Sequence, residues 1–189
     1  MNTSETTGLV LAGGAGRRAG GVDKGLVQWQ GLPLIEHVTS RLALQVGHLI
    51  ISCNRNAGEY AKYAPRVVTD QRPGHQGPLA GIEAATPLVE TPLLVVIACD
   101  VPRLPRDLVQ RLSNTLRDHP EAGAAYAVSG GRSHYLCAML RTESLPSLSA
   151  FLDEGGRAVG HWYHHLGAMG VTYTDQESAF VNINNPCDD

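Results

Sequence analysis

The chain has 189 residues, of which 43% are hydrophobic and 17% charged, and this length and composition suit one well-buried core better than two. The formal net charge is −3 and no dense run of Lys or Arg occurs, which argues against nucleic-acid and membrane-surface partners. The longest apolar run, residues 93–99, is far below the roughly 18 residues that a membrane span needs. We therefore expect a cytoplasmic protein with one domain over residues 1–189 that binds a small anion.

In the first part of the chain, short β-rich runs alternate with helical patterns. Residues 8–12, 49–52, 67–69 and 93–99 are apolar without alternation, which is typical of strands buried on both faces. Apolar residues recur at helical spacing within 34–46 and 108–116, and Pro78 can open a third helix because a first helical turn tolerates proline. This order predicts an α/β fold with a mostly parallel central sheet flanked by helices.

The pattern changes near residue 120. Residues 122–128, 136–140 and 169–173 have the composition of strands, and a helix is expected near residues 142–152. Four cysteines, at positions 53, 99, 137 and 187, form no C-x-x-C pair, which indicates neither a disulfide framework nor a zinc ribbon. We expect these cysteines to be reduced and mostly buried.

The segment that follows the first strand carries the strongest chemical signal. Residues 13–16 contain three glycines, and two arginines, Arg17 and Arg18, and then Lys24 come after them. Glycine lets backbone N–H groups approach anionic oxygens closely, Arg offers a forked contact, and Lys offers a mobile charge. The loop therefore predicts a polyphosphate cradle, and its ligand is expected to be a nucleoside triphosphate.

Two familiar glycine motifs do not fit this loop. A Walker loop ends in Gly-Lys-Ser/Thr, but Lys24 is followed by Gly25, which has no hydroxyl for a metal. The dinucleotide motif G-x-G-x-x-G would need glycine where the chain has Ala19, and no acidic residue closes a strand at the expected distance. Neither motif explains the loop.

The loop resembles the nucleotidyltransferase signature L-A-G-G-x-x-x-R-M-G-x-x-D-K, and in particular that of the molybdenum cofactor guanylyltransferases. The match covers residues 11–14, Arg18, Gly20 and 23–24, with Ala19 where the family usually has Met. The resemblance implies a Rossmann-like nucleotidyltransferase fold, with residues 1–118 as the nucleotide-binding half and residues 119–189 as the acceptor-binding half. It also implies transfer of GMP from GTP to the terminal phosphate of molybdopterin, with or without bound molybdenum, which releases pyrophosphate and forms molybdopterin guanine dinucleotide.

Asp100 is the second strong candidate. It directly follows the apolar run 93–99 and precedes Val101-Pro102, so it is expected at the carboxyl end of a central strand, where open α/β sheets bind ligands. The D-x-P pattern resembles the metal aspartate of the family, and Mg²⁺ commonly takes one or two carboxylates together with phosphate oxygens. We expect Asp100 to hold Mg²⁺ as the cofactor, with Arg18 and Lys24 as the other catalytic residues.

Further segments resemble the guanylyltransferase pattern, namely Asp70, Asn54-Arg55 and the run Gly77-Pro78-Leu79-Ala80-Gly81. Some relatives carry Asn where this chain has Ser52, so either Ser52 or Asn54 touches the nucleotide, and a strand-end turn is an equally good account of Asn54. The resemblance implies that the nucleotide is bound by Leu11, Ala12, Gly13, Gly14, Lys24, Ser52, Asn54, Asp70, Pro78, Leu79 and Asp100.

The acceptor is expected to meet the C-terminal half. Residues 180–186 resemble the family's F-V-N-V-N-T-P, and in an extended segment Asn182 and Asn184 would share one face. His134 and Arg157 are softer candidates for acceptor contacts. The histidines within 161–165 could share a helix face, but nothing completes a zinc site there, so no metal is assigned to them.

Rival interpretations share parts of this pattern. The sister cytidylyltransferase of the cofactor and the sugar-phosphate nucleotidyltransferases typically have L-A-A-G, with alanine at the position of Gly13. A non-catalytic module that only carries a nucleotide or cofactor is a rival of another class, against which Lys24 and Asp100 argue. Cofactor-delivery proteins are further partners that the resemblance allows.

Overall fold

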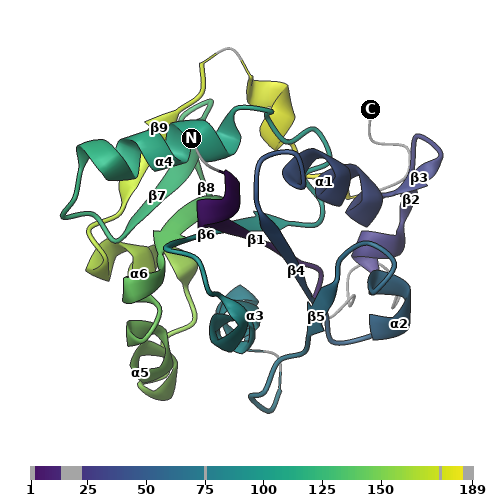
Figure 1. Ribbon diagram of the computed structural model, residues 1–189, viewed down its shortest axis with the longest axis horizontal. Coiled ribbons are helices and arrows are strands. Elements are labelled where there is room, and N and C mark those ends of the chain that lie inside the picture. The colour runs from purple at the N-terminus through teal and green to yellow at the C-terminus, as the bar shows by residue number, and fades with distance from the viewer. Residues whose placement is uncertain (1–2, 14–22, 75, 175, 185–189) are drawn as a thin grey trace.

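The computed structural model describes residues 3–13, 23–74, 76–174 and 176–184. They form one seven-stranded sheet with helices packed on both faces, and a separate two-stranded hairpin (Figure 1). In their spatial order the seven strands are β5 (Arg66–Val68), β4 (His48–Ser52), β1 (Thr6–Leu11), β6 (Leu93–Ala98), β8 (Arg132–Arg141), β7 (Ala124–Ser129) and β9 (Met169–Thr172). The hairpin consists of β2 (Gln28–Trp29) and β3 (Leu32–Pro33).

The helices lie between these strands along the chain. The α-helices of the described residues are α1 (Leu34–Leu42), α2 (Ala57–Tyr60), α3 (Pro78–Ala85), α4 (Leu108–Asp118), α5 (Ser147–Asp153) and α6 (Val159–His165). Short 3₁₀ helices cover Thr3–Glu5, Lys24–Leu26, Thr86–Leu88, Thr142–Ser144 and Glu177–Phe180. Figure 1 shows α1 and α4 on one face of the sheet and α3, α5 and α6 on the other.

Six of the seven strands run in one direction, which confirms the predicted α/β fold with a mostly parallel sheet. Strands β5, β4, β1 and β6 are mutually parallel, and β9 is parallel to β7. Strand β8 alone runs the other way, between β6 and β7. Because β8 is antiparallel, its first residues lie next to the end of β6, and this brings the two halves of the chain together at one edge of the sheet.

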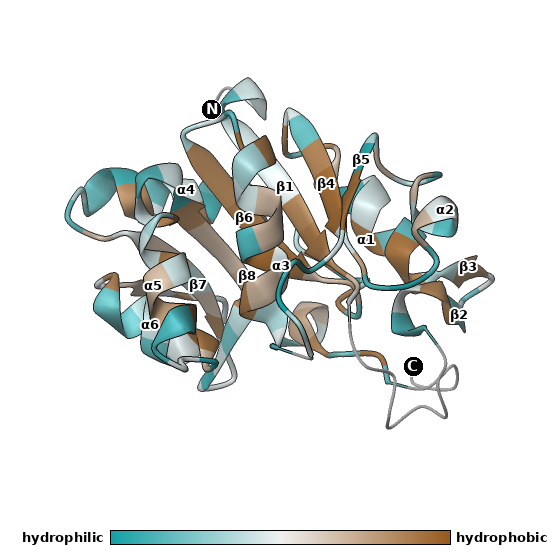
Figure 2. Ribbon diagram, turned by 90° about the horizontal axis from the view of Figure 1, so that it is seen from below, coloured by the Kyte–Doolittle hydropathy of each residue, from teal (hydrophilic) through white to brown (hydrophobic). Residues whose placement is uncertain are grey.

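The core lies on both faces of the sheet, as the unbroken apolar runs predict. All six residues of β1 are buried, and successive side chains point to opposite faces. Val10 packs with α1 and α4, whereas Leu9 and Leu11 pack with α3, α5 and α6. Figure 2 shows the hydrophobic strands β1, β4 and β6 within these layers.

One expectation about a single element was wrong, and another is confirmed only in part. Residues 67–69 were expected to be buried on both faces, but β5 is a half-buried edge strand because only β4 pairs with it. The helix expected near 142–152 is divided into a 3₁₀ turn at Thr142–Ser144 and α5, which begins after Pro146. Proline has no N–H for the helical hydrogen bond, so it interrupts a continuous helix from Thr142.

Candidate active site

A pocket of about 240 Å³, here called the inner pocket, lies at the carboxyl ends of the parallel strands. It contains seven of the residues that the resemblance implies for the nucleotide, namely Leu11, Gly13, Lys24, Ser52, Asp70, Pro78 and Asp100. Ala12 and Leu79 do not line it, because both side chains are buried in the core, at 5% and 0% exposure. Gly14 and Arg18 lie outside the described residues.

Lys24 and Asp100 form an ion pair at the mouth of the inner pocket. The Lys24 ammonium donates to Asp100 Oδ2 and, at 2.8 Å, to Asn184 Oδ1. Asp100 is only 8% exposed, and its other oxygen, Oδ1, is buried without a hydrogen-bond partner among the described residues. The Ile183 N–H also donates to the backbone oxygen of Asp100 at 2.9 Å, so the C-terminal segment is attached to this pair.

Asn54 and Asp70 form a second polar pair, which joins the ends of β4 and β5. Asn54 Nδ2 donates to Asp70 Oδ2 at 2.8 Å, and the Asp70 N–H donates to Asn54 Oδ1 at 3.0 Å. Both hydrogen-bonding groups of the Asn54 amide are thereby used to hold Asp70. Ser52, by contrast, is buried and lines the inner pocket.

Helix α3 closes the inner pocket on one side. Gly77, at φ 79°, precedes Pro78, the first residue of the helix. The glycine allows this positive φ before the helix, and the proline suits the first helical position. Gly81 then allows a close approach to β1 and β4. A Cβ at Gly81 would lie 2.6 Å from Ser52 Oγ and 2.9 Å from Leu11 Cδ2, so a side chain there would push α3 off the sheet.

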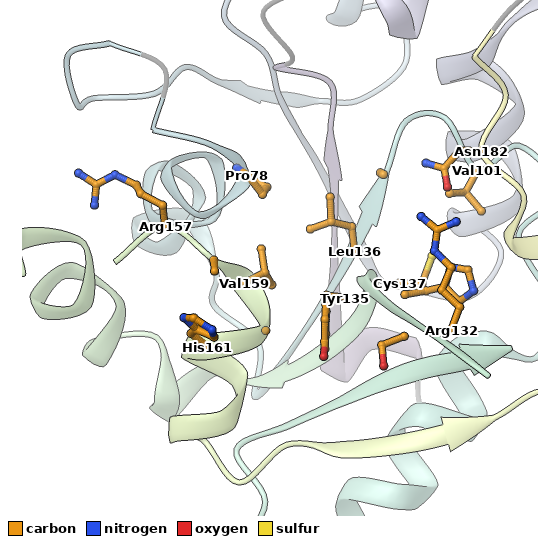
Figure 3. Close-up of a pocket in the computed structure, with 15 residues that line it drawn as sticks. Pro78, Val101, Arg132, Tyr135, Leu136, Cys137, Arg157, Val159, His161 and Asn182 are labelled. Atoms are coloured by element: carbon orange, nitrogen blue, oxygen red, sulfur yellow. The ribbon is translucent and has the colours of Figure 1, made fainter. Parts of the chain in front are cut away.

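A larger pocket of about 690 Å³, the outer pocket, adjoins the inner one and shares Pro78, Ala98 and Leu136 with it. His134 and Asn182, two of the residues expected at the acceptor site, line the outer pocket. In Figure 3 Arg157 and His161 lie on one side of it and Arg132 and Asn182 on the other, with Leu136 and Tyr135 between them.

Arg157 also lines the outer pocket, but its guanidinium is hydrogen-bonded to the backbone. It donates to the backbone oxygens of Leu152 and Gly156 at 2.8 and 2.6 Å, at the end of α5. In Figure 3 the guanidinium points away from the middle of the pocket. Asn184 does not line the outer pocket and is instead bonded to Lys24.

A third cavity of about 630 Å³ connects the two sites. It is bounded by Lys24 and Asp100 on the inner side and by Arg132, His134 and Asn182 on the outer side. A molecule seated in the outer pocket can therefore extend toward the Lys24–Asp100 pair. The arrangement suits a reaction between two ligands that meet at this pair.

Of the two histidines that line the outer pocket, His134 has a lowered pKa, which favours its neutral form. Burial, and then the charge of Arg132, lower the pKa of His134 below its usual value. Its ring stacks on Phe180, with ring centroids 5.0 Å apart. Arg132 itself has no ion pair among the described residues, so its cation is available to an anion in the pocket.

Sequence reasoning missed Arg132, Tyr135 and His161 as pocket residues. No motif marks them, and the strand expected at 136–140 begins four residues later than β8 does. The polar start of β8 became interpretable only once its antiparallel pairing, which sets Cys137 opposite Ile97, was known.

The buried cysteines fit roles in packing. Cys53, Cys99 and Cys137 are free and buried, as predicted, while Cys187 lies outside the described residues. Burial, followed by the charge of Asp100, raises the pKa of both Cys99 and Cys137 to about 12, so these thiols remain protonated.

In the described part of the chain, no three His, Cys, Asp or Glu side chains gather as a metal site. No described helix is both long and apolar enough to cross a membrane.

Comparison with known proteins identifies the class and the family. The model of the MobA-like NTP transferase domain matches residues 8–166. The molybdenum cofactor guanylyltransferase of Shewanella sediminis is 40% identical over 178 residues, which cover 94% of this chain and 90% of that protein. Its counterpart in Bordetella petrii is 39% identical over 187 residues, with coverage of 97% and 95%.

Solved structures share the fold. Molybdopterin-guanine dinucleotide biosynthesis protein A from Archaeoglobus fulgidus superposes with a TM-score of 0.74 at 24% identity, covering 95% of this chain and 93% of that one. A CMP:2-keto-3-deoxy-manno-octonic acid synthetase complexed with CTP gives 0.73 at 15% identity, with coverage of 97% and 94%. The fold is thus shared with these proteins. The family match and the curated relatives show that this enzyme is a nucleotidyltransferase. The chain belongs to the family of MobA-like NTP transferases that includes the molybdenum cofactor guanylyltransferases.

Proposed function

We propose that this enzyme transfers GMP from GTP to the terminal phosphate of molybdopterin, with or without bound molybdenum, with release of pyrophosphate and formation of molybdopterin guanine dinucleotide. The observation that carries the proposal is the Lys24–Asp100 pair, which stands where the inner pocket opens into the connecting cavity. The names of the relatives in Shewanella sediminis and Bordetella petrii, which give a guanylyl group and the molybdenum cofactor, support this choice of substrates.

The nucleotide would occupy the inner pocket. Gly13, Ser52 and Pro78 line it with small or compact groups, which leave room for a flat base and a ribose. Asp70, fixed by Asn54, offers carboxylate oxygens to hydroxyl or amino groups of the ligand. The triphosphate would extend from there to Lys24, whose ammonium neutralises charge that develops during transfer.

The residues present fit a magnesium ion at Asp100. Its Oδ1 is buried and has no hydrogen-bond partner among the described residues, which is costly unless a cation or another ligand compensates for the lost hydration. A single carboxylate together with phosphate oxygens and water is a common Mg²⁺ environment. When bound, the ion would neutralise phosphate charge and make pyrophosphate a better leaving group.

The acceptor would occupy the outer pocket. Its terminal phosphate would meet Arg132 and Asn182, which offer a guanidinium fork and an amide beside the connecting cavity. The pterin ring would lie over Leu136 and Tyr135, and its polar edge would face His161. His134, kept neutral, can donate or accept one hydrogen bond without repelling a cation.

The reaction needs no general base on the protein. The second pKa of a phosphomonoester is about 6, so the acceptor phosphate is largely ionised near neutral pH. One of its oxygens attacks the α-phosphorus of GTP, and the bond from that phosphorus to the oxygen bridging the α- and β-phosphates breaks. Lys24 stabilises the charge on the transferred and leaving phosphates, and the two adjoining pockets hold the reactants in line.

Pyrophosphate release tests the proposal. The purified protein is mixed with Mg²⁺ and one of the four nucleoside triphosphates, with and without molybdopterin. The proposal predicts release with GTP, and only when the acceptor is present. Faster release with CTP would identify the sister reaction, release without acceptor would identify a hydrolase, and no release at all would support a carrier module.

A further inference from the structure

The residue before Lys24 is held by two side chains from the segment that carries α2. Tyr60 donates its hydroxyl hydrogen to Asp23 Oδ1, and Asn56 Nδ2 donates to Asp23 Oδ2 at 3.1 Å. Both carboxylate oxygens of Asp23 are thereby engaged, and Asp23 does not line the inner pocket.

Tyr60 also contacts the residue after Lys24. It is fully buried, at 0% exposure, and a Cβ at Gly25 would lie 2.5 Å from its hydroxyl oxygen. Gly25 therefore allows the phenol to lie against the backbone of the 3₁₀ turn Lys24–Leu26. Burial, and then the hydrogen bond to Asp23, raise the pKa of Tyr60, so the hydroxyl stays protonated and remains a donor.

We propose that Tyr60 is a positioning residue for Lys24. By holding Asp23 and packing on Gly25, it fixes the turn on both sides of Lys24, so that the ammonium is directed at Asp100 and the inner pocket. This inference rests on the proposed function, because its effect is on the phosphate chemistry assigned to Lys24.

The variant Tyr60→Phe removes the hydroxyl and keeps the buried ring. We expect kcat to fall about tenfold, as for one lost hydrogen bond to a charged group, while KM for GTP changes little. Tyr63→Phe is the matched control, since Tyr63 is half-buried in the same segment and does not contact Asp23. It should leave kcat and KM unchanged.

A double-mutant cycle separates positioning from a general structural role. If Tyr60 acts through Asp23, then Tyr60→Phe combined with Asp23→Asn should lower kcat no more than the stronger single variant does. If Tyr60→Phe fails to fold, Asn56→Gly replaces it in the cycle. Asn56 is exposed, and glycine keeps its φ of 53° while removing the other contact to Asp23.

The outcomes distinguish the two proposals. A parent enzyme without guanylyl transfer would contradict the proposed function. An active parent with an equally active Tyr60→Phe variant, or with losses that add independently in the cycle, would overturn the positioning role and leave the proposed function standing.

Discussion

The inner and outer pockets are built in different ways. The inner pocket is formed where parallel strands end, and many of its residues are small or short, such as Gly13, Ser52 and Gly81. The outer pocket lies at the start of β8, the strand that runs against the other six of the large sheet, and presents longer side chains, among them Arg132 and Tyr135. Backbone geometry therefore shapes the first site, and individual side chains shape the second. Substitutions should affect the two substrates separately.

The largest effect is expected at Lys24, where the two sites meet. Lys24→Ala should lower kcat by about 100-fold or more, because it removes a cation from charge that develops during transfer. Binding of guanosine nucleotide should weaken much less. Steady-state kinetics and nucleotide titration measure the two effects, with the exposed Lys62→Ala as control. Equal turnover by Lys24→Ala and the parent would contradict the assignment.

Asp100→Asn tests the proposed Mg²⁺ site, which also lies where the two pockets meet. A neutral amide is a poor ligand for a hard cation, so the Mg²⁺ concentration for half-maximal activity should rise by about tenfold. Circular dichroism should show an unchanged fold. The exposed Asp118→Asn is the control. An unchanged Mg²⁺ requirement would mean that Asp100 serves only as a strand-end residue.

Arg132→Ala should affect the acceptor and not the nucleotide. We expect KM for molybdopterin to rise by about tenfold, since one charge-assisted contact to phosphate is lost, and KM for GTP to stay within about twofold. Arg117→Ala is the control, because Arg117 is exposed on α4 and paired with Asp118. An increase in KM for GTP alone would mean that Arg132 contacts the nucleotide and not the acceptor.

The close approach of α3 to the sheet predicts a loss of stability when Gly81 gains a side chain. Gly81→Ala would set a methyl group 2.6 Å from Ser52 Oγ, and the strain should lower the free energy of unfolding by about 1–3 kcal/mol. Gly58→Ala is the matched control, because a Cβ at this other helical glycine would meet no atom within 4 Å apart from its chain neighbours and the backbone of its own helix. Denaturant titration should find Gly58→Ala at least as stable as the parent. Equal stability of the two variants would contradict the described packing.

The smallest effect is expected at Gly13. From the sequence we hypothesise that a methyl group here crowds the guanine, but a Cβ at Gly13 would lie 3.3 Å from Asn54 Nδ2. The methyl group would therefore press on the amide that holds Asp70. We expect Gly13→Ala to lower kcat/KM for GTP severalfold, about 1 kcal/mol, and to lower CTP use less. An unchanged ratio of GTP to CTP turnover would show that Gly13 does not select the base.

The part of the sheet formed by the parallel strands β5, β4, β1 and β6 was largely predictable from the sequence. Its apolar runs marked the strands, and polar residues directly after them, such as Asp70 and Asp100, had to meet at one edge because parallel strands end together. Membership of a motif did not tell which side chains face the ligand. Leu79 belongs to the G-P-L-A-G segment, yet its side chain is wholly buried between α3 and the sheet.

The outer pocket was less predictable. Its residues come together through the antiparallel pairing of β8 with β6, and such pairing over a long sequence separation leaves no local pattern. His134 and Asn182 were predicted through family resemblance alone, and Arg132 was not predicted. The side-chain contacts of Arg157 with the end of α5 were likewise invisible in the sequence.

The fate of the α-phosphate tests the central claim most directly. The parent enzyme is supplied with molybdopterin, Mg²⁺ and GTP that carries a radioactive label on either the α- or the γ-phosphate, and the products are separated. Transfer at the Lys24–Asp100 junction predicts the α-label in a pterin dinucleotide and the γ-label in pyrophosphate, in equal amounts. Recovery of the α-label as free GMP, or of the γ-label as inorganic phosphate, would contradict it.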